Sequence, residues 1–239
     1  DRNTILIFMT DNGPTTEHFT AGLRGRKTTV FEGGIRVPFF FHWPGRMEPS
    51  QIGDIAAHID LVPTLLEAAG VEVAADAALD GISLLSRMES REASLPERTL
   101  YIQSHRGNVP QLYRNFAAIG SRYKLLQPLS FSDKMPPGAE VQLFDLETDP
   151  CESKDLFAEL PEIVERMRQQ YEIWFQEVSA TRGYSPPSIA IGTAHENPVI
   201  LTRQDWQMVG KDGWGDSDLG YWKVSVANAG AYQIRFGFG

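Results

Sequence analysis

Thr4-Ile-Leu-Ile-Phe-Met9 is an almost entirely apolar, β-forming stretch that runs into the polar group Asp11-Asn-Gly-Pro14. Because both faces of such a strand are apolar, it predicts a central strand covered by helices, as in a parallel α/β sheet. Ligands of open α/β sheets bind beyond the carboxyl ends of the strands, where Asp11 and Asn12 stand. One carboxylate and one amide oxygen suit a hard cation such as Ca²⁺ or Mg²⁺. The alternative is that Asn12-Gly13 is simply a tight turn.

The residues that follow continue the α/β pattern. Val37-Pro-Phe-Phe-Phe-His-Trp43 predicts a second buried strand, closed by Pro44-Gly45. Asp60 is a suitable N-cap for a helix over Leu61–Ala69, and Gly70 stands where such a helix ends. The order strand, loop, strand and helix is typical of α/β architecture.

The sequence changes character after Gly70. Short strands separated by tight turns predict an antiparallel sheet over Thr99–Gln103, Phe116–Gly120, Tyr123–Leu126 and Gln142–Asp145. Pro161 then begins a helix whose apolar residues recur at helical spacing, namely Ile163, Met167, Tyr171, Trp174 and Val178. Beyond the linker Ser185-Pro-Pro187, period-two alternation predicts strands over Val199–Thr202, Trp222–Val226 and Tyr232–Phe238.

These patterns predict an α/β protein in three parts. Residues 1–98 would form the end of an incomplete α/β sheet domain. Residues 99–182 would form a small α+β subdomain with an antiparallel sheet and a C-terminal helix. Residues 183–239 would form part of an all-β, sandwich-like module, with Trp206, Trp214 and Trp222 either in its core or on a face that stacks on sugars.

Composition and charge narrow the class of protein. With 239 residues, 42% of them apolar and 22% charged, the chain has the composition of a soluble globular protein. The net charge of −9 argues against nucleic acid as a partner, because binding DNA or RNA needs a basic surface. No stretch reaches the roughly 20 apolar residues of a membrane span, and the first residues do not form a signal peptide. The lone Cys151 excludes an internal disulfide framework and a multi-cysteine metal site.

Three groups of residues extend the pattern around Asp11 and Asn12. They are Gly22-Leu-Arg-Gly-Arg-Lys27, Phe31-Glu-Gly-Gly-Ile-Arg-Val-Pro38 and His42-Trp-Pro-Gly45. In the order, spacing and composition of these residues, this part of the chain resembles the second half of sulfatase family sequences. His58-Ile-Asp-Leu-Val-Pro-Thr-Leu-Leu66 and Leu143-Phe-Asp-Leu-Glu-Thr-Asp-Pro150 resemble later segments of that family, so that the resemblance covers residues 5–178.

The resemblance implies an alkaline-phosphatase-like fold and the hydrolysis of sulfate esters. In that family a formylglycine nucleophile, made from a Cys or Ser in a Cys/Ser-x-Pro-x-Arg motif, attacks sulfur beside a bound Ca²⁺. It implies that Asp11 and Asn12 are metal ligands, for Ca²⁺ or Mg²⁺, and that Lys27 is a catalytic residue that contacts the sulfate. His18, His105 and Arg106 are further candidate substrate contacts, because they lie in polar loops and suit an anion.

Some family features are missing from this chain. Cys151 is followed by Glu-Ser-Lys, the family's Asp-Asp pair of metal ligands is absent, and Thr28 stands where the family often has Gly. We therefore expect the formylglycine to lie outside this chain, and the chain alone to be inactive. Glu32 and Arg36 are expected to form a structural ion pair, and Gly33 and Gly34 to supply unusual backbone conformations.

The expected substrate is a sulfated small molecule or a sulfated carbohydrate. From the family, a periplasmic or extracellular location is expected. Two alternatives stay open. One is a phosphatase or phosphotransferase of the same superfamily, and the other is a non-catalytic carbohydrate-binding or structural module.

Overall fold

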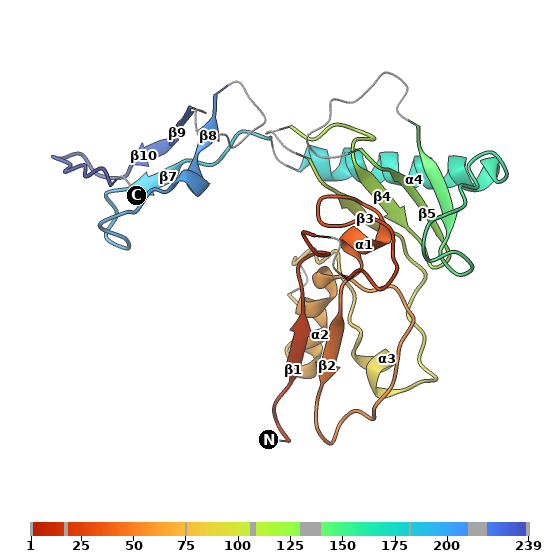
Figure 1. Ribbon diagram of the computed structural model, residues 1–239. Helices are drawn as coiled ribbons and strands as arrows, with labels where there is room; N and C mark the ends of the chain where they lie inside the picture. The colour runs from red at the N-terminus through yellow and green to blue at the C-terminus, as the bar shows by residue number, and fades with distance from the viewer. Residues whose placement is uncertain are drawn as a thin grey trace.

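A computed structural model of the protein describes residues 2–16, 19–74, 76–105, 109–129, 140–181, 183–209 and 219–237. The first part of the chain contains short elements joined by long loops (Figure 1). They are β1 (Leu6–Met9), α1 (Glu32–Ile35), β2 (Phe39–His42), a 3-10 helix (His58–Asp60), α2 (Leu61–Ala68) and α3 (Leu85–Glu89).

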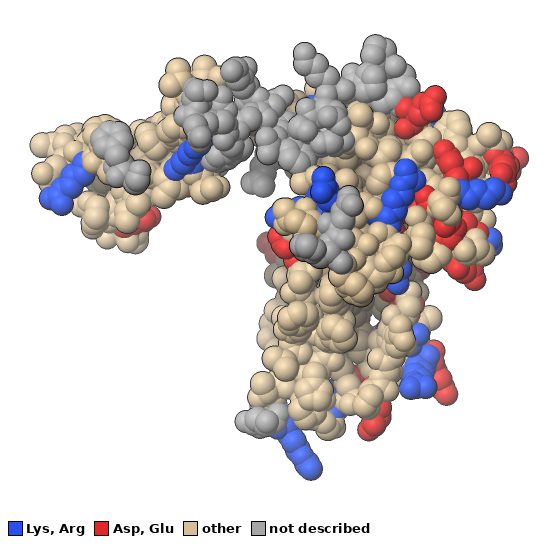
Figure 2. All heavy atoms as spheres, in the orientation of Figure 1, with Lys and Arg blue, Asp and Glu red and all other residues tan. Residues whose placement is uncertain are grey.

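The strands β1 and β2 pair with each other in an antiparallel direction, with Leu6 opposite His42 and Met9 opposite Phe39. The prediction of a central strand in a parallel sheet is therefore wrong for the described residues. An apolar run predicts a strand but not the direction of its partner, and here a long connection returns the chain beside β1. One face of the pair is exposed at Leu6, Phe8 and Phe40. Figure 2 shows few charged side chains over this part of the molecule.

Helix α2 begins where the sequence predicts, but Asp60 has a different role from the predicted one. Its side chain makes no capping hydrogen bond to α2. Its carboxylate instead accepts hydrogen bonds from the backbone nitrogens of Ala57 (2.8 Å) and Ile82 (3.0 Å) and from Arg98. Asp60 is fully buried, so it ties the start of α2 to two distant segments of the chain. Gly70 has a φ of +67°, as expected of a helix-terminating glycine.

The central part of the molecule is a four-stranded antiparallel sheet in the order β3-β4-β5-β6. Its strands are β3 (Leu100–Gln103), β4 (Phe116–Ile119), β5 (Tyr123–Gln127) and β6 (Gln142–Asp145), which agree with the predicted ranges to within one residue at either end. Helix α4 (Pro161–Ala180) lies along one face of this sheet (Figure 1).

The sheet separates two apolar cores, because its side chains alternate between the two faces. On one face, Phe116, Leu125 and Leu143 pack against Val164, Met167 and Tyr171 of α4. On the other face, Ala117, Leu126 and Phe144 pack against Val30 and Phe31, which precede α1. The loops that carry the predicted site residues therefore rest on the face opposite α4.

In the C-terminal part the described elements are short strands and one 3-10 helix, and one of the three predicted strands is present, because β10 (Val224–Val226) lies within the predicted range Trp222–Val226. This part contains β7 (Ile189–Ile191) paired in parallel with β10, and β8 (Gln207–Met208) paired with β9 (Gly220–Tyr221). Residues 199–202 and 232–237 form no strand, although their alternation predicted one. Alternation alone does not form a strand, because a strand also needs a neighbour that supplies the backbone hydrogen bonds.

Two tryptophans of this part touch each other, with the rings of Trp206 and Trp222 at 5.5 Å in an edge-on arrangement. The third predicted member, Trp214, lies outside the described residues. None of the helices that the structure describes is long and apolar enough to cross a membrane.

Candidate active site

Asp11 and Asn12 lie in the turn that immediately follows β1. Asp11 is exposed, whereas the side-chain oxygen Oδ1 of Asn12 is buried and has no hydrogen-bond partner. A buried amide oxygen without a partner is costly in a folded protein, so this atom is suited to accept a ligand. The turn is not the tight hairpin that Asn12-Gly13 could have formed, because the partner strand β2 begins only at Phe39.

Lys27 lies beside this turn, although it is thirteen positions from Pro14. Its backbone nitrogen donates a hydrogen bond of 3.0 Å to the carbonyl oxygen of Pro14. The Lys27 side chain is exposed. The structure thus brings together the segments of all three residues that the resemblance assigns to the sulfate and metal site.

The short helix α1 connects the two segments. The nitrogen of Gly13 donates to the carbonyl oxygen of Gly34 (2.8 Å), and the nitrogen of Gly33 donates to that of Arg24 (2.7 Å). Gly33 and Gly34 are helical and do not have positive φ angles, so the predicted reason for these glycines is wrong. They are required because a β-carbon on Gly33 would lie 2.5 Å from the carbonyl oxygen of Gly25, and one on Gly34 would overlap that of Thr29.

A buried ion cluster holds α1 on the sheet. The ammonium of Lys124, on β5, lies 2.8 Å from Oε1 of Glu32 and 2.8 Å from Oε1 of Glu152. Oε2 of Glu152 also accepts a 2.7 Å hydrogen bond from the backbone nitrogen of Glu32. Burial raises the pKa of the Glu152 carboxyl, although the positive charge of Lys124 opposes this. The predicted ion pair of Glu32 with Arg36 exists at 3.7 Å, but Arg36 is exposed and Lys124 is the closer partner.

Lys124 and Glu152 were missed from sequence. Alternation along β5 places Lys124 on the same face as Leu126, toward the core, and a charged residue at a core-facing position is the signal that could have identified it.

Ser104, the residue before His105, is linked to the Lys27 segment by Asn115. The side-chain nitrogen of Asn115 donates to the carbonyl oxygens of Thr28 (3.1 Å) and Ser104 (3.0 Å), which precedes His105. Burial lowers the pKa of His105, and the positive charge of Arg114 lowers it further. The imidazole is therefore neutral near pH 7. The other two predicted substrate contacts, His18 and Arg106, lie outside the described residues.

The chain contains one match to the Cys/Ser-x-Pro-x-Arg pattern, although the motif was expected to lie outside it. Ser94-Leu-Pro-Glu-Arg98 fits Ser-x-Pro-x-Arg, but it follows the Asp-Asn segment, whereas the family motif precedes that segment. Ser94 is exposed on irregular backbone. Arg98 is paired with Asp60, to whose carboxylate it donates two hydrogen bonds of 2.6 Å. We therefore assign this match a structural role. Cys151 is exposed, and its thiol contacts the carbonyl oxygen of Gly22 at 3.3 Å.

The predicted metal site is incomplete within the described residues. Across the part of the chain that the structure describes, no three or more His, Cys, Asp or Glu side chains gather in a group that could hold a metal ion. The partner-free Oδ1 of Asn12 and the adjacent carboxylate of Asp11 nevertheless fit a hard cation as two members of a larger ligand set.

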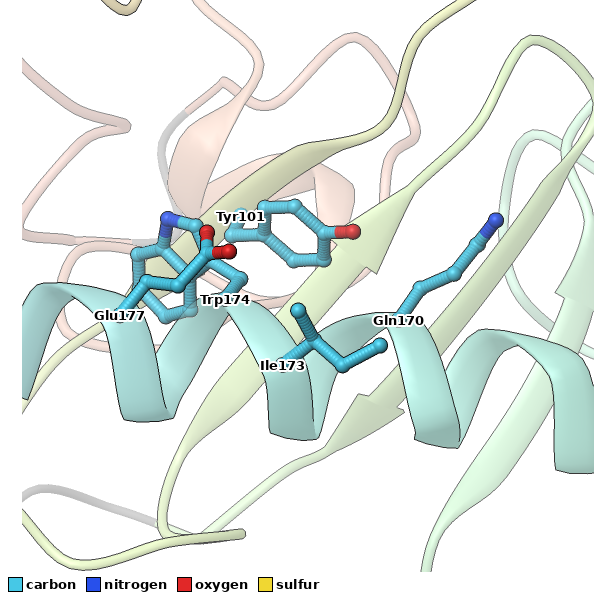
Figure 3. Close-up of a pocket in the computed structure, with 5 residues that line it drawn as sticks. All are labelled: Tyr101, Gln170, Ile173, Trp174 and Glu177. Carbon is cyan, nitrogen blue, oxygen red and sulfur yellow. The ribbon is translucent and has the colours of Figure 1, made fainter.

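A cavity of about 230 Å³ lies on the α4 side of the sheet, away from these loops. Figure 3 shows Gln170, Ile173, Trp174 and Glu177 of α4 beside Tyr101 of β3. The rings of Tyr101 and Trp174 stack on each other at 5.0 Å. None of the predicted site residues lines this cavity.

The sequence of residues 25–176 matches the family model described as "N-sulphoglucosamine sulphohydrolase, C-terminal". This match covers more than half of the chain and includes Lys27, α1 and the four-stranded sheet. The chain therefore belongs to the sulfatase family, and it corresponds to the C-terminal part of these proteins.

Individual relatives agree with this assignment. Arylsulfatase A of Bos taurus is 30% identical over 220 residues, which cover 82% of this chain and 42% of the relative. An N-acetylgalactosamine-6-O-sulfatase of Bacteroides thetaiotaomicron is 27% identical and covers 71% of this chain and 36% of its own length. This chain thus spans about two fifths of the length of its curated relatives.

Solved structures show the same fold. The crystal structure of Ps i-CgsB superimposes with a TM-score of 0.59 at 26% identity, over 72% of this chain and 36% of that one. It has also been solved in complex with k-i-k-neocarrahexaose. The family match favours a sulfatase over the phosphatase and non-catalytic alternatives.

Proposed function

We propose that the protein hydrolyses sulfate esters, with Lys27 in contact with the sulfate and with Asp11 and Asn12 as oxygen ligands of a divalent cation. The observation that supports this most directly is the convergence of the two segments. The Lys27 nitrogen bonds to Pro14, two residues after Asn12, whose Oδ1 is buried and without a hydrogen-bond partner.

Each residue has a defined role in the proposal. The exposed ammonium of Lys27 neutralises charge on a sulfate oxygen as the ester bond breaks, and it is most effective when its position is fixed in advance. Asp11 and Asn12 would hold a divalent cation through their side-chain oxygens, and that cation would supply further positive charge at the sulfate oxygens. The neutral imidazole of His105 offers a hydrogen bond to the substrate. By the family resemblance, a formylglycine outside these 239 residues provides the nucleophile.

We further propose a sulfated carbohydrate as the substrate and a periplasmic or extracellular place of action. The complex of Ps i-CgsB with k-i-k-neocarrahexaose supports a carbohydrate, because that protein shares this part of the fold.

The test uses the full-length protein that contains this chain. Release of nitrophenol from nitrophenyl sulfate would be compared for the wild type, Lys27→Ala and Asp11→Ala. We expect both variants to lose about 100- to 1,000-fold in kcat/KM, because each removes charge stabilisation. Lys154→Ala is the matched control, since Lys154 is an exposed lysine that pairs only with Glu159 in the described chain. Full activity in Lys27→Ala, or a preference for nitrophenyl phosphate, would refute the proposal.

A further inference from the structure

Lys124 is a fully buried lysine on a strand inside the sheet, at a position that ordinarily holds an apolar residue. Its ammonium meets two carboxylates, those of Glu32 and Glu152, at 2.8 Å each. Burying an ammonium costs free energy that an apolar side chain would avoid. Stability alone therefore does not explain the presence of a charged group there, and replacing buried ion pairs by apolar residues is often neutral or stabilising.

The cluster fixes α1 rather than a peripheral element. Glu32 is the first residue of α1, and its backbone nitrogen bonds to the Glu152 carboxylate. The remaining residues of α1 hold the candidate site, because Gly34 accepts from Gly13 and Gly33 donates to Arg24. Arg24 in turn donates a 2.8 Å hydrogen bond to the carbonyl oxygen of Glu152. The turn of Asn12, the loop that leads to Lys27, and Glu152 therefore share α1 as their common support.

We propose that Lys124 is a positioning residue for the candidate sulfate site, which acts by bridging Glu32 and Glu152 and so fixing α1 beneath the Asn12 turn and the Lys27 loop. The physical reason is charge. Without the ammonium, the two buried carboxylates would face each other. Their mutual repulsion would displace the start of α1 from Glu152. The proposal rests on the proposed function, because it is the sulfate site that Lys124 would position.

The experiment compares Lys124→Met and Lys124→Arg with the control Lys154→Met in the full-length protein. Amide hydrogen exchange at Gly13 and Lys27 measures how firmly the two segments are held. Calorimetry with inorganic sulfate, and KM and kcat for nitrophenyl sulfate, measure the site itself. We expect Lys124→Met to exchange faster at both amides and to bind sulfate about 10- to 100-fold more weakly, as when residues that orient ligands are replaced. Lys124→Arg keeps the charge and should lie between Lys124→Met and the wild type, and Lys154→Met should match the wild type.

The possible outcomes are distinguishable. Unchanged exchange at Gly13 and Lys27 in folded Lys124→Met would overturn the proposal, and so would a lower melting temperature with unchanged sulfate affinity and KM. If Lys124→Met does not fold, the near-isosteric Glu152→Gln is measured instead, and wild-type exchange in that variant overturns the proposal. If the wild type neither binds sulfate nor cleaves the ester, the proposed function fails. The exchange rates would then still decide whether Lys124 holds the two segments.

Discussion

Gly13 and Gly33 pack so closely that a β-carbon on Gly13 would overlap the carbonyl oxygen of Gly33. The nearest atoms belong to backbone, which cannot move aside as a flexible side chain can. The same contact joins the residue after Asn12 to α1, so the shape of the predicted metal-binding turn depends on it.

Gly13→Ala should therefore displace the turn or α1. We expect a loss of about 1–3 kcal/mol in the free energy of unfolding, as for other overpacked sites. We also expect weaker sulfate binding in the full-length protein. Urea denaturation and calorimetry measure the two effects. Gly53→Ala is the control, because no atom lies within 4 Å of its added β-carbon and its φ is not in the left-handed region. Equal stability of the two variants would show that the contact is not rigid.

Asp60→Asn should remove a buried ion pair. The Asp60 carboxylate receives two hydrogen bonds from Arg98 and is fully buried. Breaking such a pair by changing one partner costs up to about 3–5 kcal/mol, because the Arg98 charge, whose side chain is 13% exposed, loses its partner in a largely buried place. Glu159→Gln is the control, since its pair with Lys154 is exposed and should be worth less than about 1 kcal/mol.

The same substitution should change the dependence of stability on pH. Burial would raise the pKa of Asp60, but the hydrogen bonds from Arg98, Ala57 and Ile82 outweigh it and the pKa is lowered from 3.8. A carboxyl with a lowered folded-state pKa stabilises the protein fully above its unfolded-state pKa, and this stabilisation is lost as pH falls through the folded-state pKa. Urea titrations from about pH 7 to about pH 3 should show the difference between wild type and Asp60→Asn shrinking at the acid end. A difference that stays constant with pH would count against this account.

Local patterns predicted the sheet and the helix that covers it. The strands β3 to β6 are joined by turns or flanked by turn residues, and α4 repeats its apolar residues every three or four positions, so neighbouring residues carried the signal. The direction of β1 was predicted wrongly as parallel, because it depends on a partner 30 or more residues away. Of the C-terminal strand predictions, Trp222–Val226 is met in part by β10, whereas residues 199–202 and 232–237 form no strand, because alternation does not specify a partner.

The site was predictable only in part, for the same physical reason. The Asp11-Asn12 turn and Lys27 were assigned through the family resemblance, and the structure brings their segments together. The buried ion cluster that supports this turn and Lys27 was not predicted. Lys124 meets Glu32 across 92 positions, and Glu152 meets Glu32 across 120. The alternation of β5 marks Lys124 as a charged residue at a core-facing position, but a single sequence does not say which carboxylates it meets across such separations.

Thr28→Gly should stabilise the protein. Thr28 has a φ of +80°, a left-handed conformation that is strained for a β-branched residue and natural for glycine. Asn115 bonds to the backbone oxygen of Thr28, so the substitution leaves this contact in place. We expect a gain of about 1 kcal/mol, measured as a higher urea midpoint.

Thr29→Gly is the matched control for Thr28→Gly. The hydroxyl of Thr29 donates a hydrogen bond to the carbonyl oxygen of Arg26 (2.8 Å) and accepts one from the backbone nitrogen of Arg26 (3.1 Å). Thr29→Gly removes both hydrogen bonds, so we expect this variant to be destabilised. A destabilised Thr28→Gly would show that the strain is offset by the threonine side chain.

His105→Gln should abolish the proton uptake that accompanies substrate binding. In the free protein, burial and the charge of Arg114 lower the pKa of His105, so the imidazole is neutral near pH 7. An anion bound beside it favours the charged form and raises that pKa, so binding takes up protons. Sulfate affinity should therefore rise as pH falls toward the pKa of His105 in the complex.

Calorimetry of inorganic sulfate binding in two buffers of different ionisation enthalpy measures this uptake directly. The wild-type protein should take up a fraction of a proton on binding, and His105→Gln should take up none while keeping most of its affinity, because Lys27 still carries the main charge. Equal proton uptake by both proteins would show that His105 does not contact the sulfate. Lys27 would then remain the proposed positively charged contact.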